Sequence, residues 1–120
     1  MKAPRELRVS KDRKLLTVSF DGEQPMPISA EMLRVLSPSA EVRGHAPEER
    51  VTVSGKEDIA IVRIDPVGNY AVRIVFDDGH QTGLYSWDYL AKLGRERDAL
   101  WQQYLDELAR QGLRRGRGPS

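Results

Sequence analysis

The stretch that most constrains the fold of this chain is residues 76–90, where signals for a strand, a turn, a second strand and a helix follow one another. The turn falls at 77–79, because its glycine accepts the positive φ that tight hairpins require. A return strand is expected over 80–85. Ser86 then has the side chain of a helix N-cap, and Asp88 lies in the first turn, where the helix dipole favours a carboxylate.

The rest of the chain adds strands with the same kind of pattern. Apolar residues alternate with polar ones, which indicates half-buried sheet. The nearly continuous apolar run at 59–64 predicts a central, well-covered strand, and residues 65–69 have the composition of a turn. Two prolines confine the piece at 24–28 to an edge. Strands are therefore expected at 5–10, 14–20, 24–28, 59–64, 70–76 and 80–85.

Three helices complete the pattern. Ser29 can cap a short helix that ends before Pro38, and the helix capped by Ser86 is expected to stop at Gly94. The segment 95–111 carries an apolar stripe at helical spacing that includes Trp101. The sequence therefore predicts an α+β fold: one antiparallel sheet of about five or six short strands, one short inserted helix and C-terminal helices.

Composition excludes several classes of protein. The chain has 120 residues, enough for one domain, and its formal net charge of +1 gives no reason to expect a nucleic-acid partner. It has no cysteine, which excludes disulfides and Cys-ligated zinc. No apolar run suits a signal peptide or a membrane span, so we expect a cytoplasmic protein without a membrane partner. Residues 112–120 are basic and nearly free of apolar side chains, which predicts a disordered tail.

Three blocks of sequence identify a family. They are LRVLSPSAEVRGH (33–45), IDPVGNYAVRIVFDDGH (64–80) and TGLYSWDYL (82–90). In this order they resemble the gamma-butyrobetaine-hydroxylase-like N-terminal domain family, in its stand-alone bacterial form. The resemblance covers roughly residues 5–94, which we take as the domain, and the C-terminal helix and tail lie outside it.

The resemblance implies an accessory role. In eukaryotic hydroxylases the domain precedes a 2-oxoglutarate- and iron-dependent catalytic domain, and in plastids it is fused to iron–sulfur assembly ATPases. In the hydroxylases a Cys-x-Cys-x-x-Cys motif and a distant histidine bind a structural zinc. Those positions fall on Ser37, Ser39, Val42 and His80 in this chain. Serine is a poor zinc ligand and valine is none, so the resemblance implies that this zinc site is absent, and we expect no cofactor.

No catalytic constellation stands out, since neither a nucleophile elbow nor a phosphate loop is present. We therefore expect a non-enzymatic interaction or adaptor domain with a protein partner. Its recognition surface would combine the loop 37–50, the turn 77–80 and the helix start 84–88. The candidate binding residues are Arg43, His45, Asp78, His80, Tyr85 and Trp87.

The alternative hypothesis is a metal-binding module that serves iron–sulfur or oxygenase systems. His45 and His80, with Asp78 or Glu41, would offer nitrogen and oxygen donors that suit iron or zinc. Simpler structural roles compete with both hypotheses, because a histidine can hydrogen-bond its own turn and aromatic side chains usually pack. The helix 95–109 can likewise pack on its own sheet or associate with a partner.

Overall fold

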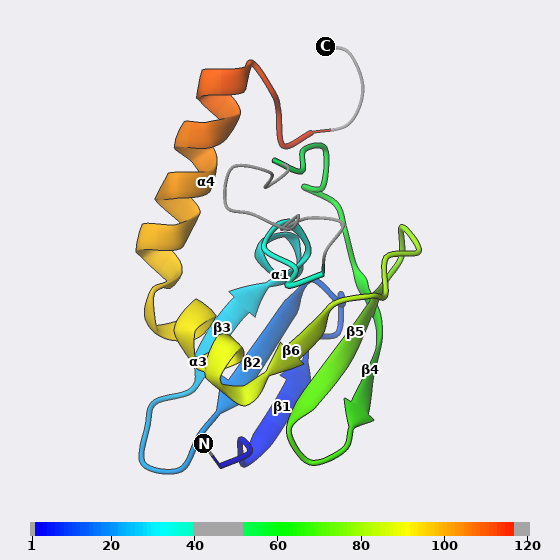
Figure 1. Cartoon of the computed structure of the whole chain (residues 1–120), viewed down its shortest axis with the longest axis vertical. Coiled ribbons are helices and arrows are strands. Elements are labelled where there is room, and N and C mark those ends of the chain that lie inside the picture. Colours follow the sequence, from blue (N-terminus) through cyan, green and yellow to red (C-terminus); the bar gives the residue numbers. More distant parts are fainter. Residues whose placement is uncertain (1, 40–51, 117–120) are drawn as a thin grey trace.

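The computed structural model describes residues 2–39 and 52–116, which form six strands and three helices (Figure 1). The α+β class predicted from the sequence is confirmed. The elements are β1 (Glu6–Val9), β2 (Leu15–Ser19), β3 (Met26–Ser29), α1 (Ala30–Val35), β4 (Ile61–Val67), β5 (Ala71–Phe76), β6 (Leu84–Ser86), α3 (Trp87–Arg95) and α4 (Arg97–Gln111).

The strands lie in two antiparallel sheets of three, β1-β2-β3 and β4-β5-β6, where the sequence suggested one larger sheet. Each sheet is a meander whose strands follow one another in the chain, so each strand pairs with its neighbour in sequence. The Ile61 N–H donates to the Arg13 carbonyl oxygen over 2.8 Å, which links β4 to the turn between β1 and β2. Side chains from both sheets and from all three helices named above form one core.

Serine caps start two of the helices as predicted. Ser29 Oγ accepts from the Met32 N–H at 3.0 Å and begins α1, and Ser86 Oγ accepts from the Tyr89 N–H at 3.2 Å and begins α3. Each cap is the last residue of a strand, so the last strand of each sheet leads directly into a helix (Figure 1). These local signals are what the sequence specifies most directly.

The strand expected to be central lies at an edge instead. β4 is the outer strand of its sheet, and Val62 is 45% exposed. The register of β4 against β5 shifts between Ile61 and Arg63. Val62 falls within this irregularity, so its side chain is not on the buried face of the sheet that the apolar run predicted. β4 also continues through Val67, so the turn is shorter than predicted and centres on Gly68, whose φ is 54°.

Two boundaries near α3 also differ from the prediction. β6 begins only at Leu84, because residues 80–83 make contacts with the α1 side of the molecule. Gly94 does not end α3, which continues to Arg95. A Cβ at Gly94 would lie 2.7 Å from Met26 Sδ, so this glycine allows close helix–strand packing.

The apolar stripe of α4 packs on its own domain, where Tyr104 and Leu108 are buried. Residues 112–116, which we call the C-terminal strap, are placed against residues 55–57 by backbone hydrogen bonds, where the sequence predicted disorder. Residues 117–120 of the predicted tail lie outside the described residues. No helix in the described part of the chain is long and apolar enough to cross a membrane.

Candidate functional site

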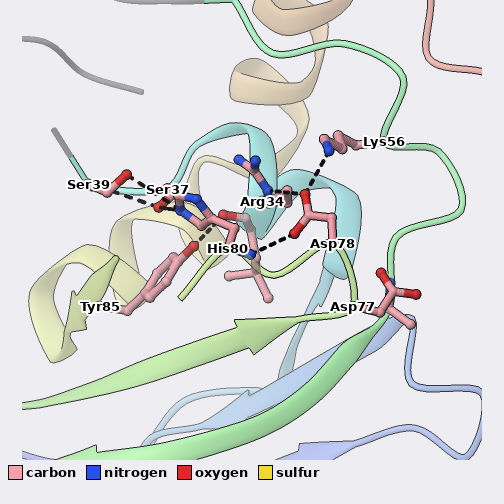
Figure 2. Close-up of polar contacts among 10 residues, drawn as sticks. Arg34, Ser37, Ser39, Lys56, Asp77, Asp78, His80 and Tyr85 are labelled. Carbon is pink, nitrogen blue, oxygen red and sulfur yellow. Dashed lines mark hydrogen bonds and ion pairs between the residues drawn. The ribbon is translucent and has the colours of Figure 1, made fainter. Parts of the chain in front are cut away.

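The turn after β5 positions the candidate site. Gly79 takes a φ of 90°, and the Gly79 N–H donates to the Phe76 carbonyl at 3.1 Å. Asp78 Oδ1 accepts from the His80 N–H at 3.0 Å, as in an Asx turn. This turn sends the His80 ring and the Asp78 carboxylate in opposite directions, as Figure 2 shows.

On one side of the turn, His80 meets two serines. Its Nε2 lies 2.8 Å from Ser37 Oγ and 3.4 Å from Ser39 Oγ, and the Ser39 N–H donates to Ser37 Oγ (Figure 2). Ser37 is fully buried and His80 is 8% exposed. We call these three residues the His80 cluster. Its polar atoms form hydrogen bonds within the chain, as buried polar groups require.

The surroundings of the His80 cluster leave little space. A Cβ at Gly83 would collide with Ser37 Oγ and lie 3.2 Å from Pro38 Cδ, so only glycine fits there without rearrangement. Beside it, the Tyr85 hydroxyl donates to the Leu33 carbonyl at 2.5 Å. Burial raises the pKa of Tyr85 well above its ordinary value, and the tyrosine is neutral at physiological pH.

On the other side of the turn, Asp78 Oδ2 accepts from Arg34 Nε at 2.8 Å and from Lys56 Nζ at 2.7 Å (Figure 2). Partial burial by itself would raise the pKa of Asp78. The hydrogen bonds from Lys56, the His80 amide and Arg34 outweigh burial and hold that pKa well below its usual value. Arg34 Nη1 is buried and has no hydrogen-bond partner among the described residues. We call Arg34, Lys56 and Asp78 the Asp78 ion cluster.

The donor atoms of the His80 cluster do not fit a zinc ion. Ser37, Ser39 and His80 come together where the family resemblance places three of the zinc ligands, yet they supply two neutral hydroxyls and a single imidazole. Among the described residues, no three His, Cys, Asp or Glu side chains are grouped as metal ligands would be. The Asp78 carboxylate is directed toward two cations instead.

The His80 cluster also lacks the geometry of a catalytic dyad. Ser37 and His80 are close enough for proton transfer, but Ser37 has no exposed surface through which a substrate could reach its hydroxyl. Asp78 bonds the backbone of His80 and not its ring, so it does not orient the imidazole as the acid of a triad does.

The other predicted site residues have different positions. Arg43 and His45, with Glu41, lie outside the described residues. Tyr85 is fully buried, so it cannot touch a partner in this conformation. Trp87 is half-buried at the start of α3, and its Nε1–H donates to the Asn69 carbonyl at 2.9 Å.

Sequence reasoning missed Arg34 and Lys56. No local pattern marks these two cations. Arg34 lies in the last turn of a short helix, 44 residues from Asp78, and Lys56 lies in an irregular segment 22 residues away. Only the fold brings them to the carboxylate.

Comparison with known proteins places this geometry in a family. The family described as gamma-butyrobetaine hydroxylase-like, N-terminal, matches residues 7–91. Two solution structures determined by NMR are 44% identical to the chain. One has a TM-score of 0.86 and covers 100% of this chain and 94% of its own. The other has a TM-score of 0.82 and covers 97% and 86%.

A third similar structure is the crystal structure of a protein of unknown function of the DUF971 family, from Acidithiobacillus ferrooxidans. It is 33% identical to the chain with a TM-score of 0.63, and the match covers 76% of this chain and 91% of that one. No curated protein matches the sequence.

Proposed function

The chain belongs to the gamma-butyrobetaine hydroxylase-like N-terminal family, and within that family we propose that it acts as a non-enzymatic interaction domain. The observation that carries this proposal is a contrast in exposure. The polar side chains of the His80 cluster are buried and bonded within the chain, whereas the large apolar side chains of Tyr70 and Leu84 are open to solvent. Buried polar groups with internal partners stabilise a fold, and exposed apolar groups favour contact with another molecule.

The proposed contact surface lies at the end of the β5–β6 pair, and consists of Tyr70, Leu84 and Trp87. Tyr70 is 56% exposed and Leu84 is 41% exposed. The hydrogen bond from Trp87 to the Asn69 carbonyl ties the start of α3 to the β4–β5 turn that precedes Tyr70. The surface is therefore presented by a rigid hairpin and helix start, which lowers the entropy cost of binding.

This surface overlaps with the recognition surface predicted from the sequence at the helix start, residues 84–88. Trp87 and its neighbour Leu84 belong to that region, and Tyr70 is added to it by the pairing of Ala71 with Ser86. The Asp78 ion cluster fixes the turn through which β5 continues toward β6. Aromatic side chains at a rigid corner are typical anchors in protein interfaces.

Site-specific photo-crosslinking tests the proposal. The photoreactive residue p-benzoylphenylalanine replaces Leu84 or Tyr70 in the full chain, and replaces Arg8 as the control. Arg8 lies on β1 with 71% of its side chain exposed. We expect Leu84 and Tyr70 to give a covalent adduct of the same protein partner after irradiation in cells, and Arg8 to give none.

A second variant separates the role of the contact surface from that of the His80 cluster. Ser37→Ala removes a hydroxyl from the His80 cluster but leaves the proposed contact surface intact, so the folded variant should give the same adduct. Equal adducts from Leu84 and Arg8 would contradict the proposed surface. Loss of the adduct in a folded Ser37→Ala chain would show that the His80 cluster itself carries the function.

A further inference from the structure

A groove on another part of the molecule has the features of a binding site. It has a volume of about 370 Å³ and lies between α4, β3 and α1. Pro27 and Met32 contribute apolar surface, and Trp101 of α4 lines the groove with its ring. Two charged side chains that also line it, Glu31 and Arg115, bind each other.

The contact between these two side chains is a specific guanidinium site. Arg115 Nε donates to Glu31 Oε2 at 3.0 Å, and Arg115 Nη2 donates to Glu31 Oε1 at 2.8 Å. The guanidinium carbon also lies 5.1 Å from the centre of the Trp101 ring. A bidentate carboxylate and an aromatic face together select a planar guanidinium over the ammonium group of lysine.

The carboxylate in this site requires a cation. Glu31 is only 5% exposed, and a buried carboxylate is costly unless a charge and hydrogen bonds compensate it. Arg115, by contrast, is 40% exposed in its side chain and belongs to the C-terminal strap. The receptor side of the pair is therefore built into the core, and the arginine comes from a segment at the surface.

The backbone of the strap is recognised as well. The Gly55 N–H donates to the Arg114 carbonyl at 2.8 Å, and the Glu57 N–H donates to the Arg115 carbonyl at 3.0 Å. The strap leaves α4 at Gly112, whose φ of 67° ends the helix. Two backbone donors and one side-chain pocket are the elements with which domains bind short peptide segments.

The strap fills only part of this site. Arg115 occupies the guanidinium position, yet the adjoining groove beside Trp101 and Met32 is still open. A peptide that places an arginine on Glu31 and an apolar side chain in the groove would make contacts that the strap does not make. Such a ligand could displace the strap despite the advantage of a tethered competitor.

We propose that Glu31 and Trp101 form an arginine-recognition site, held in cis by Arg115, that binds an arginine-bearing peptide segment of a partner protein when the strap is displaced. Charge complementarity identifies this class of ligand, since the buried carboxylate needs a guanidinium. The site uses residues other than Tyr70, Leu84 and Trp87, so it extends the proposed function to a second surface and does not depend on it.

Peptide binding to the full chain tests the inference. The probe is a fluorescent peptide, acetyl-Leu-Arg-Arg-Gly-amide, with the sequence of residues 113–116, and its anisotropy is measured against increasing protein. Arg115→Ala should bind it about 10-fold more tightly than the unchanged chain, because an occupied site lowers the apparent affinity in proportion to its occupancy. Arg114→Ala is the matched control, since Arg114 is exposed, and it should bind like the unchanged chain.

Two further measurements complete the test. Adding Glu31→Gln to Arg115→Ala should abolish the gain, and a probe with lysines in place of arginines should bind about 10-fold more weakly. Arg115→Lys provides the same comparison if Arg115→Ala does not fold, as judged by its amide NMR spectrum. Equal binding by Arg115→Ala and the unchanged chain, or undiminished binding after Glu31→Gln, would overturn the inference.

Discussion

Two polar regions of this small domain each contain a buried polar side chain, and they differ in which part of the chain covers it. The His80 cluster and the adjacent Asp78 ion cluster use side chains from the interior of the matched region, residues 7–91. The arginine site joins Glu31, inside that region, to Trp101 and Arg115, beyond it. The first is closed by the fold itself and the second by a terminal strap.

This difference indicates what each region does. The His80 cluster and the Arg34–Asp78 pair are enclosed by residues of the matched region, so they can open only if the domain loosens, and their polar bonds contribute to stability. A region closed by a strap can open while the rest of the domain stays folded, so its polar bonds can be exchanged for those of a ligand. Substitutions should therefore cost more stability in the first region than in the second.

The largest effect is expected at Asp78. Asp78→Ala should lower the free energy of unfolding by about 2–3 kcal/mol, because it leaves Arg34 without its carboxylate in a site where both side chains are 13% exposed. Asp58→Asn is the control, since Asp58 is 70% exposed and lies 3.7 Å from Lys14, and it should cost less than about 1 kcal/mol. Urea denaturation measures the free energy of unfolding of both variants. Equal losses would contradict the larger contribution expected of the Asp78 ion cluster.

The same carboxylate should make stability depend on pH. The folded-state pKa of Asp78 is lowered from its ordinary 3.8, so its contribution is fully present above pH 3.8 and is lost as the pH falls through the folded pKa. The difference in urea midpoint between the unchanged chain and Asp78→Asn should therefore be constant from pH 7 to 5 and shrink below pH 3.8. A difference that grows on acidification would show that the charge of Asp78 is not what stabilises the fold.

A smaller loss is expected in the His80 cluster. Ser37→Ala removes the 2.8 Å hydrogen bond to His80 and should cost about 1–2 kcal/mol. Ser39→Ala removes a 3.4 Å contact to the same nitrogen and should cost less than Ser37→Ala. Thermal unfolding of the two variants under the same conditions decides the order, and a larger loss for Ser39→Ala would contradict the geometry described.

The smallest loss of stability is expected at the strap. Arg115→Ala should cost about 1 kcal/mol, since the Arg115 side chain is 40% exposed and its ion pair is weakened by solvent. Hydrogen exchange should show the loss concentrated at the amides of Gly55 and Glu57, whose acceptors are in the strap. Uniformly faster exchange across the two sheets would mean that the strap is part of the cooperative fold.

The sequence predicted what depends on neighbouring residues. Ser29 and Ser86 were identified as caps because capping is decided within three residues, and both are confirmed. The α+β class followed from alternation in the strands and the apolar stripe of α4. The end of α3 was misplaced because the close contact between Gly94 and Met26 comes from packing and not from local preference.

What the sequence did not predict depends on contacts between distant residues. The bulge in β4 moved Val62 to the surface, and no local pattern marks a register shift. Arg34 and Lys56 surround Asp78 from two other segments, and Arg115 reaches Glu31 across 84 positions of the chain. The basic composition of residues 112–120 suggested a solvated tail. Composition does not reveal that Arg115 in this segment pairs with the buried carboxylate of Glu31.

The most direct test of the account is the metal content of the full chain, purified without a tag under anaerobic conditions, with and without His80→Ala. Because the polar atoms of the His80 cluster form hydrogen bonds with one another, we predict negligible iron and zinc in both proteins. The melting temperature should not change with added iron, zinc or chelator, since a metal that bound only the folded state would raise it. Near-stoichiometric iron or zinc that disappears in His80→Ala would contradict the account and make the His80 cluster a metal site.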